Sequence, residues 1–401
     1  MSFVDHLRKF YRVSFRHLVN VCRTGSRNGT ESGSPSSLGS SRTNSEVASS
    51  TPCCPATELP LDVHILIIEW IFRLSQHIII DHTTLRACAL VCRAWTPTAQ
   101  RLLFRRIRCT SLDDSQCNIQ LLVSTLSIRP HLAAHVRYIY VTWPTDPPEY
   151  VDVCLRLLEL CRHVEGVSFL KWGAYNFTTL STGLDARLHA IQLRPVLLDV
   201  DGILDYTISS SIARMCPGPR VLVLTANYDY PLPPTLEALE ILADRAHGCL
   251  SRSHPLPALR YLCLISPSWP GTLDRHLNST GILPHLQSLQ IQGIFPPPEV
   301  LNQLAQLRTL VVSELPGQHV DLPPSLRYFG YHAWGASPDA RSELAAGMLH
   351  ALPGLQLVTV TRGVEQHVRI ALERMCHDRA VDFGIYETPF HFQEPRHIDW
   401  I

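Results

Sequence analysis

The segment Pro257-Ala258-Leu259-Arg260-Tyr261-Leu262-Cys263-Leu264 contains the pattern that decides the fold of the larger part of the chain. An apolar residue is followed by two others, a second apolar residue, one other and a third apolar residue. Apolar side chains at alternate positions are typical of a strand with one buried face. The clearest copies are Leu236/Leu239/Ile241, Leu259/Leu262/Leu264, Leu286/Leu289/Ile291 and Leu307/Leu310/Val312. Further copies are Val136/Ile139/Val141, Val164/Val167/Phe169, Leu326/Phe329/Tyr331 and Leu355/Val358/Val360, with weaker ones ending at Val200 and Leu224.

The spacing of these copies resembles that of a leucine-rich repeat, whose period is about 20–29 residues. Each copy is expected to form one short strand, and stacking of the strands in chain order predicts a parallel sheet in a curved solenoid. Leucine-rich repeats usually place Asn or Cys five residues after the central position. Only Asn227 does so here, where other copies have residues such as Asp244 and Pro267. We therefore expect an irregular solenoid.

The segment before the repeats predicts three helices. In TELPLDVHILIIEWIFRL (residues 57–74), apolar residues recur every three or four positions, which favours a helix after Pro60. LRACALVCRAW (residues 85–95) and PTAQRLLFRRI (residues 97–107) predict the second and third helices. Leu66, Ile68 and Trp70 widen the apolar surface of the first helix, so that one face is expected to pack on this chain and another on a partner.

Residues 58–108 resemble an F-box, and the segment LRACALVCRAW is similar to the corresponding segment in F-box proteins of mushroom-forming fungi. The resemblance implies a subunit that docks on the Skp adaptor of a cullin ubiquitin ligase and performs no bond chemistry itself. The implied adaptor-binding residues are Leu59, Pro60, Ile67, Ile68, Ile71, Leu85, Val91, Cys92 and Trp95. Some of them must also pack the helices together, and Trp95 is expected in that core. The connection SQHIIIDHTT (residues 75–84) departs from the family in length and apolar content.

The predicted organisation is an α/β chain of four parts. Residues 1–23 form an amphipathic helix, for which membrane contact and organelle targeting are alternatives to a solvated helix. Residues 24–57, rich in Ser, Gly and Thr, form a disordered linker. The F-box follows at 58–108, and the leucine-rich-repeat-like solenoid occupies 109–401. It is expected to end in a capping helix over 364–377 and a strand over 381–386.

A rival hypothesis rests on Val196-Leu197-Leu198-Asp199-Val200-Asp201-Gly202, which resembles the first motif of haloacid-dehalogenase-like phosphatases. That resemblance would make Asp199 the nucleophile and Asp201 the acid. The family also needs a basic residue, usually Lys, and no lysine follows Lys171. A repeat strand that ends in an acidic turn explains the motif without catalysis. A protein-interaction scaffold without ligase recruitment is the other alternative.

The composition favours a protein partner. The chain has 35 basic and 35 acidic residues, so its charge does not favour nucleic acid. Its 13 cysteines include neither an extracellular framework nor paired CxxC motifs, which predicts reduced, buried thiols without a metal or cofactor. No apolar run approaches the roughly 18 residues of a membrane span. We expect a cytoplasmic or nuclear protein whose target the sequence does not identify.

Overall fold

The computed structural model describes most of the chain after residue 81. The described residues are 62, 63, 65, 66, 68, 69, 82–91, 93–109, 115–143, 148–171, 187, 190–201, 206–225, 231–242, 249–266, 273–293, 295–316, 318–332 and 342–386. The predicted N-terminal helix and linker lie outside them. The chain divides into two compact units, residues 1–105 and 106–401, and the division falls three residues before the predicted boundary.

The second unit is built on one sheet of twelve parallel strands, which pair in chain order from β1 to β12. The strands are β1 (Arg106–Cys109), β2 (Tyr138–Trp143), β3 (Gly166–Lys171), β4 (Leu197–Asp201), β5 (Val221–Leu224), β6 (Ala238–Leu242), β7 (Tyr261–Ser266), β8 (Ser288–Gly293), β9 (Thr309–Val312), β10 (Tyr328–Tyr331), β11 (Leu357–Thr361) and β12 (Asp382–Tyr386). This mixed α/β architecture with sequential parallel strands is solenoid-like, which confirms the coarse prediction.

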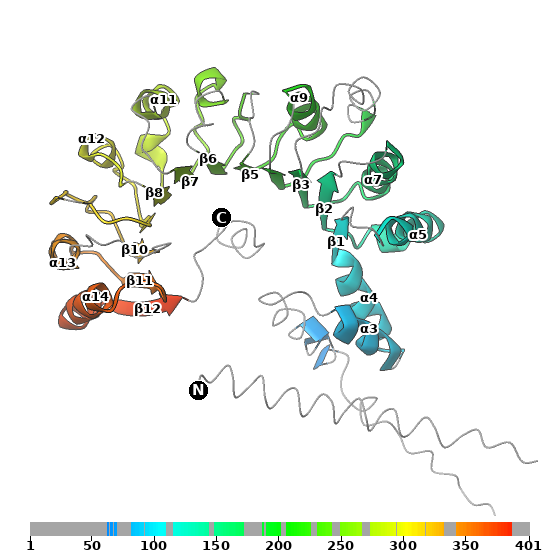
Figure 1. Cartoon of the computed structure of the whole chain (residues 1–401), viewed down its shortest axis with the longest axis horizontal. Coiled ribbons are helices and arrows are strands. Elements are labelled where there is room, and N and C mark those ends of the chain that lie inside the picture. The colour runs from blue at the N-terminus through cyan, green and yellow to red at the C-terminus, as the bar shows by residue number, and fades with distance from the viewer. Residues whose placement is uncertain are drawn as a thin grey trace, which may run out of the picture. The chain divides into compact units, whose positions relative to one another are not determined.

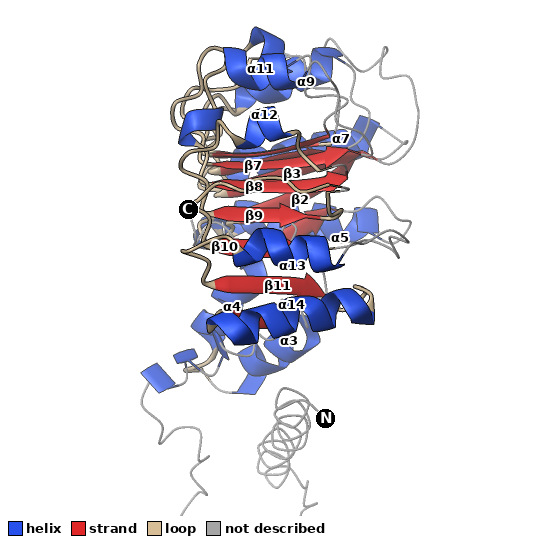
Figure 2. Ribbon diagram, turned by 90° about the vertical axis from the view of Figure 1, so that its left-hand side faces the viewer, coloured by secondary structure: helices blue, strands red, loops and turns tan. Residues whose placement is uncertain are grey.

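Helices connect many of the strands and lie on one side of the sheet (Figure 1). They are α5 (Ser115–Ile128), α6 (Pro130–Ala133), α7 (Pro148–Leu160), α9 (Tyr206–Met215), α11 (Leu273–Ser279), the 3-10 helix η3 (Leu283–His285), α12 (Pro298–Leu301), α13 (Ser342–His350) and α14 (Gln366–Arg379). Within this unit the strands line the inner side of an arc and the helices its outer side. Figure 2 shows the strands stacked one above another in the same direction.

The central apolar residue of each predicted copy occupies the same register position in every strand. The pairs run Ile139↔Val167, Val167↔Leu198, Leu198↔Leu222, Leu222↔Leu239, Leu239↔Leu262, Leu262↔Leu289, Leu289↔Leu310, Leu310↔Phe329 and Phe329↔Val358. These side chains are 0–2% exposed, so they form a continuous buried row under the helices. All ten predicted strands are confirmed. The central apolar residues of consecutive copies are paired with one another, so the positions of the copies in the sequence correspond to the register of the sheet.

Two strands extend the series beyond the ten copies. Ile107 of β1 pairs with Ile139, and Phe383 of β12 pairs with Val358. The helix predicted to include residues 106 and 107 is therefore wrong at its end: α4 (Thr96–Arg105) stops one residue before β1. Pairing with β2 satisfies the backbone of these residues and buries Ile107 and Cys109.

The predicted C-terminal helix and strand are confirmed as α14 and β12. Helix α14 ends at Arg379. The next residue, Ala380, has a φ of 54° in the left-handed region and turns the chain toward β12. β12 is more than a cap beside the repeats, because it continues their sheet as its last strand.

Substitution Leu239→Ala should lower the free energy of unfolding of the sheet unit by about 2–5 kcal/mol, because it opens a cavity in the central row. Leu239 is fully buried. The measurement is the midpoint of urea unfolding followed by circular dichroism. Leu121→Ala, on a side chain of α5 that is 66% exposed, is the matched control and should change stability by less than about 0.5 kcal/mol. Equal effects of the two changes would contradict the assignment of the core.

Candidate protein-binding surfaces

The N-terminal unit has a small apolar core made by its helices. Described residues between 62 and 69 are helical, and they are followed by α3 (His82–Val91) and α4. The core consists of Ile68, Leu85, Cys88, Trp95, Ala99 and Leu102, each at most 3% exposed. Trp95 lies between α3 and α4, where its large side chain contributes the most buried area.

Two polar contacts hold these helices together. The Thr96 hydroxyl donates a hydrogen bond of 2.9 Å to the carbonyl of Ala89, which ties the start of α4 to α3. The guanidinium of Arg101 on α4 donates to the carboxylate of Glu69 at 2.7 Å. Because this ion pair is partly exposed, its contribution to stability is small, and the apolar core supplies most of the stability of the unit.

Three of the nine predicted adaptor-binding side chains lie in this core. Ile68, Leu85 and Trp95 are at most 2% exposed, so they support the surface rather than form it. The expectation that Trp95 packs in the core is confirmed. Val91 is the last residue of α3, and nothing is described of its side chain. Leu59, Pro60, Ile67, Ile71 and Cys92 lie outside the described residues.

Among its described residues, the same unit exposes three other apolar side chains. Val63 is 36% exposed, Leu66 is 64% exposed and Leu90 is 87% exposed. Leu90 follows Leu85 by five positions, so it points away from the face of α3 that carries Leu85 and Cys88. Leu66 belongs to the apolar surface predicted for the first helix, whereas Leu90 was not predicted to be exposed. The signal was present in LRACALVC, where more apolar residues occur than one helical face can bury.

The second candidate, the Asp199-Val200-Asp201 motif, lies within the sheet. Asp199 pairs in register with Ser168 of β3 and Val223 of β5, and it is 4% exposed. The Ser168 hydroxyl donates a hydrogen bond of 2.7 Å to Asp199 Oδ2. Oδ1 has no hydrogen-bond partner among the described residues. At the end of β4, the Thr225 hydroxyl donates to the carboxylate of Asp201.

Burial determines the protonation of Asp199. Loss of solvation raises the pKa of its carboxyl group to about 6, an effect that the Ser168 hydrogen bond opposes and the charge of Asp201 reinforces. The adjacent cavity, lined by Tyr138, Gly166 and Asp199 among others, has a volume of about 10 Å³. That volume is on the order of one water molecule, far less than a phosphoester requires. This geometry favours a repeat strand over a phosphatase nucleophile.

Thiols and metal-ligating groups offer no further site in the described part of the chain. The cysteines whose side chains are described are Cys88, Cys109, Cys154, Cys161, Cys216, Cys249, Cys263 and Cys376. All are unbridged, and their burial was predicted. Burial raises the pKa of Cys161 and Cys216 to about 12, so these thiols stay protonated at neutral pH. Among the described residues, no group of three His, Cys, Asp or Glu side chains is arranged to hold a metal ion.

Comparisons with known proteins add little to this geometry. No family model matches the chain, and no curated protein matches it. A crystal structure of a Bacteroides fragilis protein is similar over 69% of this chain and 84% of its own, with 15% identity and a TM-score of 0.42. Within the described residues, no helix has the length and apolar content that a bilayer crossing requires.

Asp199→Asn should weaken the pH dependence of stability. Because the pKa of Asp199 is raised from 3.8 to about 6 in the folded state, the wild-type protein loses stability as pH rises between these values. The loss is complete above pH 6 and amounts to on the order of 2–3 kcal/mol. The variant lacks this loss, so its stability relative to wild type should improve from pH 4 to pH 8.

The measurement is urea unfolding at several pH values. Asp382→Asn, which removes one carboxylate at an exposed position of β12, is the matched control. A stability difference between Asp199→Asn and wild type that stays constant across this range would contradict the burial argument.

Proposed function

We propose that this chain is the substrate receptor of a Skp/cullin/F-box ubiquitin ligase. Its F-box at residues 58–108 would bind the Skp adaptor, and its leucine-rich-repeat-like solenoid would hold a target protein for ubiquitination. The receptor uses no cofactor and performs no bond chemistry. Its place of action would be the cytoplasm, the nucleus or both.

The observation that carries the proposal is the combination of the F-box resemblance with exposed apolar side chains on the same unit. Leu66 and Leu90 have no role in the core of that unit, and exposing them to water costs free energy unless a partner covers them. Exposed apolar side chains that lie together mark protein-interaction sites. Leu66 and Leu90 belong to a different compact unit from the sheet, and a chain with two units suits a receptor that binds two partners.

A scaffold without ligase recruitment is the second candidate. The sheet unit has its own core and its own surface, and such a unit binds proteins without an adaptor. Capture of the adaptor separates the two hypotheses, because a scaffold has no use for it.

The test is a pull-down and a titration of the purified full chain with a recombinant Skp adaptor. The wild-type chain should bind, and Leu66→Glu and Leu90→Glu should each weaken binding at least about tenfold, because each places a charge in an apolar interface. These side chains are exposed, so the variants should unfold at the wild-type midpoint.

Leu121→Glu on α5 is the control, because it adds the same charge to an exposed leucine of the sheet unit and should leave adaptor binding unchanged. Leu59→Ala and Pro60→Ala test the implied start of the F-box. Failure of the wild-type chain to bind the adaptor would contradict the receptor hypothesis and favour the scaffold. Magnesium-dependent phosphoester hydrolysis that is lost in Asp199→Asn would instead revive the phosphatase.

A further inference from the structure

One row of side chains runs along the sheet just before the strands begin. We name it the leading row: Arg137, Glu165, Val196, Arg220, Glu237, Arg260, Gln287, Arg308, Arg327 and Gln356. Each carbonyl in the row up to Arg327 accepts hydrogen bonds from two backbone N–H groups of the next repeat. The Arg308 carbonyl, for example, accepts from Arg327 at 2.8 Å and Tyr328 at 2.9 Å. Neighbouring members are therefore held about 4.8 Å apart along the sheet.

The two halves of the leading row differ in charge. In the first half, arginines are paired with neighbouring acids: Arg137 Nε lies 3.5 Å from Glu165, and Arg220 donates two hydrogen bonds of 2.6 and 2.7 Å to Glu237. After Glu237 the row continues as Arg260, Gln287, Arg308, Arg327 and Gln356, without an acidic residue. The second half therefore carries three positive charges that the row itself does not neutralise.

Two of the three arginines of the second half are held by carbonyl groups rather than by carboxylates. Arg260 donates to the carbonyl of Pro257 at 2.7 Å, and Arg327 donates to that of Gly354 at 2.8 Å. These bonds fix the guanidinium groups but leave their charge in place. Arg308 is exposed and makes no side-chain hydrogen bond or ion pair with a described residue. Arg308 and Arg327 follow one another in the row, and like charges on neighbouring strands repel.

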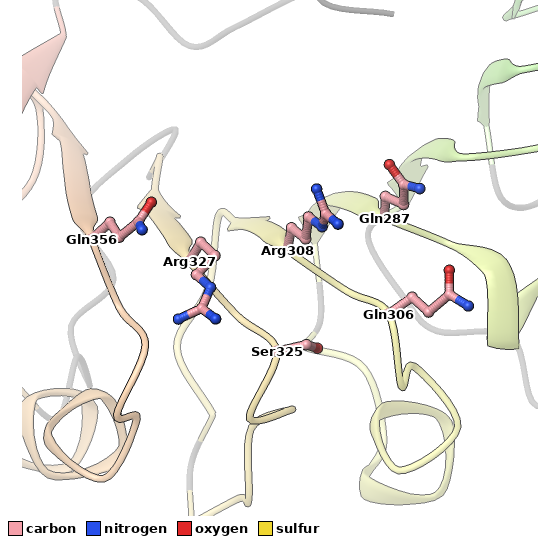
Figure 3. Close-up of a pocket in the computed structure, with 6 residues that line it drawn as sticks. All are labelled: Gln287, Gln306, Arg308, Ser325, Arg327 and Gln356. Atoms are coloured by element: carbon pink, nitrogen blue, oxygen red, sulfur yellow. The ribbon is translucent and has the colours of Figure 1, made fainter.

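A groove of about 470 Å³ lies over this part of the row, as Figure 3 shows. Its lining combines two guanidinium groups with three amides and a hydroxyl, and includes no carboxylate. The lining residues are Gln287, Gln306, Arg308, Ser325, Arg327 and Gln356. In Figure 3, Arg308 lies between Gln287 and Arg327 along the row. The Arg308 and Gln287 side chains point to one side of the strands, whereas the Arg327 guanidinium turns to the other side.

We propose that this groove binds an acidic segment of a partner protein through its carboxylate or phosphate groups. Guanidinium groups form two parallel hydrogen bonds with either anion, and the amides add donors on both sides. An anion bound at Arg308 would also offset the positive charge of Arg327 on the neighbouring strand. The volume suits a few residues of an extended chain rather than a compact domain.

The pattern of charge favours a short acidic segment over nucleic acid. A duplex carries a charge about every 1.7 Å along its axis and needs a continuous basic track. Beyond Arg260, a polyanion that followed the leading row would meet Glu237 and, farther along, Glu165. In the receptor proposed above, the target would supply this segment. That link rests on the proposed function, but the groove itself belongs to the sheet unit alone.

Gly354 positions one of the two guanidinium groups. A side chain at this position would collide with the Nη1 and Cζ atoms of Arg327. Gly354→Ala therefore moves the Arg327 guanidinium without changing any charge. It tests the geometry of the groove, whereas Arg308→Gln tests its charge and keeps a polar group that can donate hydrogen bonds.

The test is fluorescence anisotropy of the full chain, without adaptor, against three labelled peptides. All have one Gly/Ser background and carry two adjacent phosphoserines, two glutamates or two glutamines. The phosphoserine peptide, the glutamate peptide or both should bind, and which of them binds more tightly identifies the anion. The glutamine peptide should not bind, and added salt should weaken binding.

Arg308→Gln should raise the Kd about tenfold, and Gly354→Ala should raise it by several-fold. Arg362→Gln is the matched control, because this exposed arginine follows β11 at the other ends of the strands. It should leave the Kd unchanged, and all variants should keep the wild-type unfolding midpoint and adaptor binding.

Three results would overturn the proposal. The first is no binding of either acidic peptide, and the second is an equal loss in Arg308→Gln and Arg362→Gln. The third is displacement of the peptides by an oligothymidine at a lower concentration than the unlabelled phosphopeptide requires. Because no adaptor is present, failure here leaves the ligase proposal standing, and failure of adaptor capture leaves the groove standing.

Discussion

Parallel pairing of each strand with the next one along the chain is the constraint on which the sheet unit depends. It places Ile139, Val167 and their counterparts in one buried row, and it lines up the residues that precede the strands. Each repeat is stabilised by its neighbours rather than by distant segments. One backbone arrangement therefore produces both the apolar core under the helices and the charged leading row at the edge of the sheet.

The same constraint accounts for the acidic motif. Asp199 and Asp201 look catalytic when they are read along the chain, because two carboxylates follow an apolar run. In the sheet, Asp199 lies between Ser168 and Val223 of the neighbouring strands, away from solvent. Its raised pKa follows from burial, which perturbs structural carboxyl groups as well as catalytic ones.

In the N-terminal unit, packing of the helices decides which apolar side chains of the motif are buried and which are exposed. Its apolar residues are too many for one face of each helix, and sequence alone does not assign them to the inside or the outside. Packing of α3 on α4 buries Leu85 and Trp95 and leaves Leu90 exposed. Three residues expected to contact the adaptor, Ile68, Leu85 and Trp95, thus hold the helices together, whereas Leu66 and Leu90 are exposed.

The sequence by itself determined the strands and their order. The apolar pattern with a period of two predicts which residues of each strand are buried. Because the pattern recurs, it also predicts that Leu239, Leu262 and Leu289 share one register position. The sequence did not predict strand β1 at Ile107, because helix α4 runs directly into this strand and no turn residue separates the two. Tertiary structure decided which side chains become neighbours across repeats. Arg308 and Arg327 are 19 positions apart in the chain, and only the stacking of their strands makes them adjacent without an acid beside them.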